Sequence, residues 1–227
     1  MPDPHPTPAG TATPAEADAP PIWYARILSS TNPLLSLKVE VEGGDPLDFI
    51  HAVEAFRPAP QGLRPARLRL TPRFQGIPCE IADAFRVIDG LLIVSPRFRE
   101  ALERFDLGPT RLHELPILHE DGTNTAYPPH HLLHVAQTRG ALVAERSENI
   151  RKFTYYGEEG PRPGAPWTAT FQPDRLAVSA QAARGADLWA DPAIMNRIFF
   201  SDRLKRAMDE AGLAARALQM VQATTLP

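Results

Sequence analysis

The sequence predicts an α+β fold, in which a mixed or antiparallel sheet is covered by amphipathic helices. Apolar and charged residues alternate strictly over residues 37–42, which is typical of a half-exposed strand. Two short apolar strands each lead into a helix that begins at a serine, Ser95 or Ser201. These two units, each a strand, a capped helix and a strand, repeat at a shift of 106 residues (201 − 95), which favours an internal structural repeat.

The N-terminal part is expected to hold a tail, two strands and one helix. Residues 1–21 contain seven prolines and almost no large apolar side chain, so we expect a disordered tail there. Strands are expected over 22–28 and 37–42. Asp45 and Pro46 suit the N-cap and first position of a helix that extends through Phe56. We expect residues 22–67 to form a β-rich lobe or layer, and residues 68–227 to form the main α+β domain.

The first repeated unit begins with an apolar strand over 91–94. Ser95 is a good N-cap and Pro96 suits the first helical position, because that position needs no N–H donor. Gly108 and Pro109 end the helix, and a strand is expected over 111–118. The apolar face of this helix has the spacing i, i+3, i+4, i+7: Phe98, Ala101, Leu102 and Phe105.

The second unit begins with an apolar strand over 198–200. Ser201 is the cap, and Asp202 places a negative charge where the helix dipole favours it. Gly212 ends this helix. Its apolar face repeats the spacing of the first one: Leu204, Ala207, Met208 and Ala211. Between the two units, residues 157–166 are rich in Pro and Gly and predict a surface loop.

Composition excludes several classes of protein. The 227 residues carry 24 Lys and Arg against 27 Asp and Glu, so the near-neutral balance argues against a nucleic-acid binder. No apolar stretch approaches the ~20 residues of a membrane helix, and the start does not resemble a secretion signal. The single cysteine, Cys79, cannot form an internal disulfide, which fits a reducing cytosol. We expect a cytoplasmic protein that binds neither nucleic acid nor membrane.

Histidines form the densest group of residues with chemical potential. On a helix, His130 and His134 would share one face at the spacing that binds zinc, but His131 stands where a metalloprotease has its glutamate. On a strand, His130 and His134 would point the same way and His131 the opposite way. Five of the seven histidines lie in this region: His113, His119, His130, His131 and His134.

No catalytic set assembles in the sequence. Gly43 and Gly44 lack the spacing of a phosphate-binding loop, and no serine has the glycine-flanked setting of a nucleophile elbow. Glu80 next to Cys79 opposes thiolate formation, so we expect this cysteine to act as a small apolar residue. We expect no enzyme activity and no cofactor.

Three stretches resemble a known family. They are residues 90–102, residues 127–147 around Leu132-Leu133-His134-Val135, and Asp187-Leu188-Trp189 followed by residues 198–213. Over about residues 68–222, the chain resembles the bacterial polymorphic-toxin immunity family of myxobacterial type. Members often have Asn where His134 stands here, which bears on a local polar contact.

The resemblance implies a cytoplasmic α+β protein that neutralises a cognate toxin or effector by stoichiometric binding. Trp, Tyr and Arg dominate binding energy in protein interfaces, and acidic groups suit a basic toxin. We expect the interface among three groups of residues. They are Tyr155, Tyr156, Glu158 and Glu159; Trp189 and Asp191; and Glu120 and Asp121, which follow His119 in a turn. The alternative for the two tyrosines is a strand end that covers the core, and the resemblance around Trp189 favours core packing for that residue.

Two other functions remain open from the sequence. One is a metal-dependent hydrolase built on the histidines, with His119, His130 and His134 as the first candidate ligands. The other is an adaptor that carries an effector without inhibiting it and uses residues 1–21 as a tether.

Overall fold

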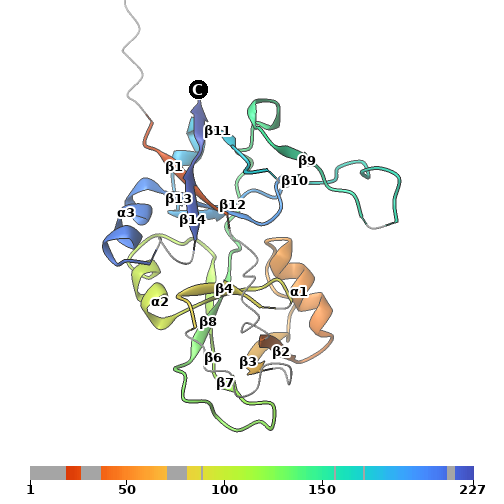
Figure 1. Cartoon of the computed structure of the whole chain (residues 1–227), viewed down its shortest axis with the longest axis vertical. Helices are drawn as coiled ribbons and strands as arrows, with labels where there is room; N and C mark the ends of the chain where they lie inside the picture. The colour runs from red at the N-terminus through yellow and green to blue at the C-terminus, as the bar shows by residue number, and fades with distance from the viewer. Residues whose placement is uncertain are drawn as a thin grey trace, which may run out of the picture.

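The computed structural model describes residues 19–26, 37–70, 81–87, 89–155, 157–170, 172–213 and 218–227. Within them, three α-helices and several β-sheets form the expected α+β fold (Figure 1). No helix formed by these residues is long and apolar enough to cross a membrane.

Two four-stranded antiparallel sheets have the same internal arrangement. In each, the first two strands form a hairpin, the second strand of the hairpin pairs with a third strand, and the third strand pairs with a fourth at the opposite edge. The first sheet has the order β4 (Ala84–Arg86), β5 (Leu92–Val94), β8 (His130–His134) and β6 (Arg111–Leu115). The second has the order β12 (Leu188–Ala190), β13 (Arg197–Ser201), β1 (Ile22–Arg26) and β14 (Gln219–Gln222).

Each hairpin leads into a helix with the expected cap. The Ser95 hydroxyl accepts a hydrogen bond from the Phe98 N–H in α2 (Pro96–Leu102), at 3.2 Å. Ser201 makes the same 3.2 Å bond to the Leu204 N–H in α3 (Asp202–Glu210). The repeat of capped helices is therefore confirmed.

The structural repeat begins further upstream than the match between the two units in the sequence. The N–H of Ser95 donates to the carbonyl of Asp83, and the N–H of Ser201 donates to the carbonyl of Asp187, both at 2.8 Å. The serine hydroxyls donate to the same two aspartates. Ser95 lies 12 residues after Asp83, whereas Ser201 lies 14 residues after Asp187, so a fixed shift of 106 residues misses this match.

The remaining elements form smaller sheets. Strand β3 (Arg64–Leu70) pairs with β2 (Leu37–Glu42) and β7 (Ile117–Leu118), and α1 (Pro46–Glu54) lies beside them. Strand β9 (Ile150–Lys152) pairs with β10 (Trp167–Ala169), and β11 (Ala177–Ser179) pairs in parallel with β15 (Thr224–Leu226). Two short 3₁₀ helices are η3 (Ala144–Arg146) and η4 (Ala180–Ala183).

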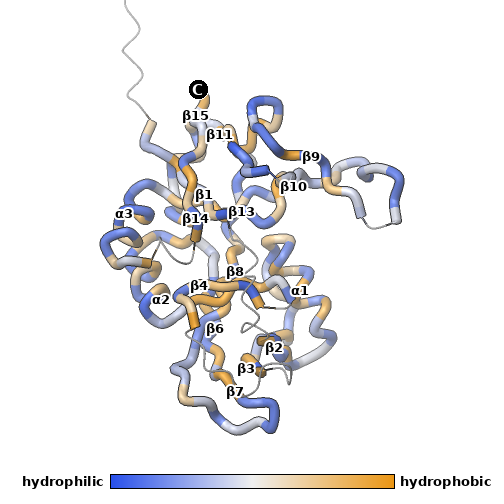
Figure 2. Tube along the Cα trace, viewed as in Figure 1, coloured by the Kyte–Doolittle hydropathy of each residue, from blue (hydrophilic) through white to orange (hydrophobic). Residues whose placement is uncertain are grey.

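One apolar core joins the two repeated units. It contains Phe98 and Leu102 from α2 together with Phe200, Leu204 and Met208 from the second unit, all almost fully buried. The hydropathy colours in Figure 2 show the apolar stretches along the strands, while α3 is largely hydrophilic outside its buried face. Burial of these side chains stabilises the pair of units as one body.

Strands β1, β2 and β3 share their sheets with strands from the rest of the chain. The boundary expected after residue 67 falls inside β3, and β1 is a central strand of the C-terminal sheet. The strand expected over 111–118 is interrupted at Pro116, which separates β6 from β7. Residues 1–18 of the expected tail, and Cys79, lie outside the described residues.

Candidate functional site

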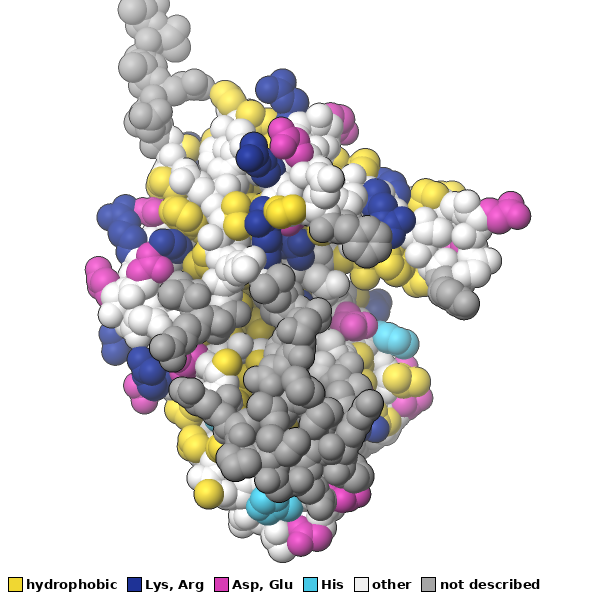
Figure 3. Space-filling model, viewed as in Figure 1, with side chains coloured by type: hydrophobic (Ala, Val, Ile, Leu, Met, Phe, Trp, Pro, Cys, Tyr) yellow, Lys and Arg dark blue, Asp and Glu magenta, His cyan; other side chains and the backbone are white. Residues whose placement is uncertain are grey.

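An arm formed by β9, β10 and the loop between them extends away from the body of the molecule (Figure 1). In the space-filling view it forms a separate lobe with acidic side chains near its end (Figure 3). It carries the first group of expected interface residues: Tyr155, Glu158 and Glu159. Tyr156 belongs to the same segment but lies outside the described residues.

Tyr155 presents an aromatic ring to solvent. Its exposed fraction is 49%, and among the described residues only Leu47 is another large apolar side chain as open as this. The ring packs edge-on against Phe153, with centroids 4.9 Å apart. The Arg162 guanidinium lies over the ring, 4.8 Å from its centroid. These contacts hold an exposed ring in a defined position.

The two glutamates of the arm differ in their surroundings. Glu158 accepts a 2.7 Å hydrogen bond from Arg162 Nε, so its charge is paired within the arm. Glu159 is exposed. Sequence reasoning missed Arg162, although its position four residues after Glu158 is a spacing at which opposite charges often pair.

Trp189 and Asp191 are not surface residues, which corrects their assignment to the interface. Each is 1% exposed. Trp189 stacks on Phe199 with ring centroids 5.8 Å apart, and Arg139 covers the ring at 4.5 Å. Asp191 accepts hydrogen bonds of 2.7 Å from the backbone N–H groups of both Ala141 and Leu142. A partner cannot reach either side chain without opening the core.

Glu120 and Asp121 do lie at the surface, in the turn between β7 and β8. The Thr123 hydroxyl and N–H donate to the Asp121 carboxylate, and these bonds hold the pKa of Asp121 below its usual range. Arg69 donates to the backbone carbonyl of Glu120 at 2.8 Å. This turn is therefore an ordered, exposed and acidic feature.

The histidines follow the strand alternative. His130, His131 and His134 are buried in β8, whereas His119 is exposed in the turn after β7. His130 and His134 each bond a backbone carbonyl, of Pro128 and Arg57 respectively. His134 also stacks on His113, at 5.9 Å between ring centroids. Among the described residues, no three His, Cys, Asp or Glu side chains are grouped so that they could hold a metal ion.

Burial controls the protonation of these imidazoles. It lowers the pKa of His130, His131 and His134, and also that of His113, because the charged form loses its hydration. The four side chains are therefore neutral at pH 7. His130 and His134 stabilise the first sheet through ring packing and backbone hydrogen bonds, whereas His131 Nε2 lies 3.3 Å from the Arg99 guanidinium.

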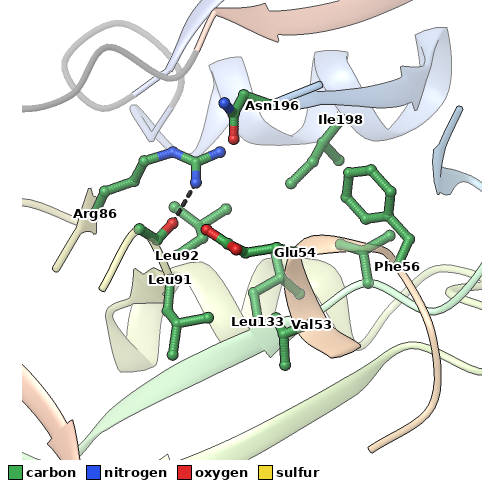
Figure 4. A pocket seen from close by; sticks show the side chains of 11 residues that line it. Val53, Glu54, Phe56, Arg86, Leu91, Leu92, Leu133, Asn196 and Ile198 are labelled. Atoms are coloured by element: carbon green, nitrogen blue, oxygen red, sulfur yellow. Dashed lines mark hydrogen bonds between the residues drawn. The ribbon is translucent and has the colours of Figure 1, made fainter. Parts of the chain in front are cut away.

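A small cavity lies where α1, the first sheet and the second sheet meet (Figure 4). Its volume is about 30 Å³, so it has room for little more than water. Arg86 reaches into it and donates to the carbonyl of Gly90. Burial lowers the pKa of the Arg86 guanidinium to about 10, so it still carries its charge at neutral pH. A cavity of this size does not accommodate an organic substrate.

The comparison with protein families places the chain in a family. The model of the Immunity protein family (Imm11) matches residues 39–223. The chain belongs to the Imm11 immunity protein family. No curated protein matches the chain. The resemblance seen over residues 68–222 is confirmed, and the Imm11 match extends it to include β2, α1 and β3. Strand β1 precedes the matched region, although it is central in the second sheet.

Proposed function

We propose that this Imm11 protein binds a cognate bacterial toxin and neutralises it by stoichiometric protein–protein interaction in the cytoplasm. Membership of the immunity family carries this proposal. The toxin or effector is the partner, and neutralisation involves no catalytic turnover and no cofactor.

The chemistry of the described residues supports a binding role. Two buried acids serve structure: Asp191 accepts backbone N–H groups of a loop, and Asp187 accepts the hydroxyl of Ser201, which caps α3. The buried histidines are neutral and pack within the first sheet. In contrast, Tyr155 and Glu159 are directed to solvent on a projecting arm. Exposed aromatic groups on an ordered scaffold are the usual anchors of protein interfaces.

Co-expression with the gene immediately upstream tests the proposal. We expect that gene to encode a toxin with a C-terminal toxic domain, and we expect this protein to rescue growth. Purified components should form a complex of fixed stoichiometry, and inhibition should reach completion only at that ratio. Failure of rescue with both proteins folded, or complete inhibition at far below the molar amount of toxin, would contradict stoichiometric neutralisation.

A further inference from the structure

We propose that the arm, defined as residues 150–169, inserts into a concave cleft of the cognate toxin, with Tyr155 as its main anchor. This inference rests on the proposed function and specifies how binding occurs. The cleft is expected to have apolar walls and a basic inner end.

The base of the arm is fixed to the body of the protein. Strands β9 and β10 pair over three residues each. The Trp167 N–H donates to the carbonyl of Ala193 at 2.7 Å, and the Met195 N–H donates to the carbonyl of Trp167 at 2.8 Å. Trp167 and Ile150 also pack against the core around Tyr24 and Trp189. The arm therefore projects in a defined direction.

The loop beyond the strands is held by its own contacts. The Phe153 N–H donates to the carbonyl of Pro166 at 2.9 Å, which extends the hairpin. Lys152 Nζ donates to the carbonyl of Ala165 at 2.8 Å and lies 4.5 Å from the centroid of the Trp167 ring. Further out, Arg162 joins Tyr155 and Glu158. These contacts link the two sides of the arm along its length.

An ordered arm of this kind suits insertion into a partner. Side chains that are already fixed lose little conformational freedom on binding, so their contacts contribute more fully to affinity. Long projecting loops in other binding proteins enter concave sites, whereas flat surfaces are met by broad faces. Tyr155 has the exposed ring, and Arg162 positions it.

The charged residues of the arm predict how charge is distributed in the cleft of the partner. Residues 157–165 contain two glutamates and one arginine, and Glu159 at this end is exposed. Arg151 and Lys152, at the base, are both exposed. The outer end is therefore acidic and the base is basic, so a complementary cleft is basic inside and acidic at its rim.

The test uses the full chain and the C-terminal toxin domain encoded immediately upstream. Titration calorimetry should show that Tyr155→Ala weakens binding by about 30-fold or more, as for an interface hot spot. Tyr155→Phe keeps the ring and should retain the affinity within a few fold. Leu47→Ala removes the other exposed large apolar side chain, on α1, and should bind as the parent protein does.

Two more variants test the arm and its polarity. Replacement of residues 154–166 by Asn-Gly-Thr, in which Asn-Gly forms a two-residue hairpin turn and Thr supplies the N–H that Pro166 lacks, should abolish inhibition of the toxin while thermal unfolding remains cooperative. Glu159→Lys should weaken binding about tenfold, because it brings like charges together. Hydrogen exchange in the complex should slow on both sides of the arm, in 151–155 and in 162–167.

The outcomes separate this inference from the proposed function. If the parent protein binds the toxin domain but Tyr155→Ala and the Asn-Gly-Thr variant bind equally well, the arm is not the anchor and the inference is wrong. Slowed exchange on one side of the arm only would also overturn insertion. If the folded parent protein does not bind the folded toxin domain, it is the proposed function that fails.

Discussion

Asp83 and Asp187 occupy the same place in the two repeated units. Replacing each of them by alanine therefore compares how much the two carboxylates contribute to the stability of the protein. Each aspartate receives the hydroxyl of a capping serine and lies near an arginine two residues after that serine. Asp187 is 1% exposed, whereas the side chain of Asp83 is 27% exposed. We expect Asp187→Ala to be about twice as destabilising as Asp83→Ala.

The magnitude follows from the donors that each substitution leaves behind. Asp187→Ala removes the acceptor for the Ser201 hydroxyl and for the Asp106 N–H, which donates at 3.0 Å. Both hydrogen bonds are partly buried, so each donor that loses its acceptor costs toward the lower end of about 1–3 kcal/mol, and the two together cost about 3 kcal/mol. Arg203, which donates at 2.6 Å, is 67% exposed and returns to water at little cost.

The first unit loses less. Among the described residues, the Asp83 carboxylate accepts from the Ser95 hydroxyl at 2.6 Å and lies 3.7 Å from Arg97, which is 66% exposed. One buried donor is left, so the expected cost is about 1.5 kcal/mol. The pKa of Asp187 also indicates a carboxylate that is held by hydrogen bonds. Burial acts to raise its pKa, but hydrogen bonds from Arg203 and Ser201 outweigh burial and lower the pKa below its ordinary value of 3.8.

Urea and thermal unfolding of the two variants provide the assay. For a chain of this size, 1 kcal/mol shifts Tm by about 2–4 °C, so Asp187→Ala should lower Tm by about 9 °C and Asp83→Ala by about half as much. Arg97→Ala, at the exposed arginine of the first unit, serves as the control and should lower Tm only slightly. Equal losses at the two aspartates, or a larger loss at Asp83, would refute the reasoning from buried donors.

Three other predictions concern the body of the protein. Burial lowers the pKa of four histidines below the ordinary 6.5: His113, His130, His131 and His134. Stability should therefore be full above pH 6.5 and fall as the pH drops below it, by at most about 1.4 kcal/mol per pH unit for each of these imidazoles. Urea titrations at pH 5 and pH 7.5 measure this, and equal stability at both would contradict it. Trp189→Ala should cost about 3–5 kcal/mol in urea unfolding, since it empties the space between Phe199 and Arg139, and a cost below about 1 kcal/mol would show that the ring is not structural. A chain that begins at residue 37 should fail to unfold cooperatively by circular dichroism although it contains the whole Imm11 match, because it lacks β1; a cooperative transition near that of the full chain would contradict this.

Local signals in the sequence were sufficient to predict where the two capped helices begin. A serine before an apolar face of helical period determines the N-terminus of α2 and of α3 without help from distant residues. The two aspartates that support these caps escaped notice because their hairpins differ in length by two residues. Distance along the chain also hid the place of β1, which pairs with β13 and β14 from the far end of the sequence.

The interface candidates show the same division between local and distant information. A Pro- and Gly-rich loop follows Tyr155, but the sequence fits an interface and a strand end that covers the core equally well, and only the structure shows that the ring is exposed. Residue type alone does not place Trp189, since Trp serves both interfaces and cores, although the resemblance around it favours the core. Its burial depends on Phe199 in the neighbouring strand and on Arg139, which lies 50 residues earlier in the chain. By sequence, the histidines of β8 fit either a helix or a strand, and the pairing with β5 and β6 places them on a strand.

The way in which the arm is attached explains how a binding specificity can be placed on this fold. The body depends on a core shared by both repeated units, so a change at Phe98 or Met208 affects the whole structure. The arm is joined to that body through two strands of three residues and a few backbone hydrogen bonds near Trp167. Substitutions beyond Phe153 therefore alter the projecting surface with little effect on the core. This separation suits the proposed function, because recognition on the loop can change while the stability of the scaffold is retained.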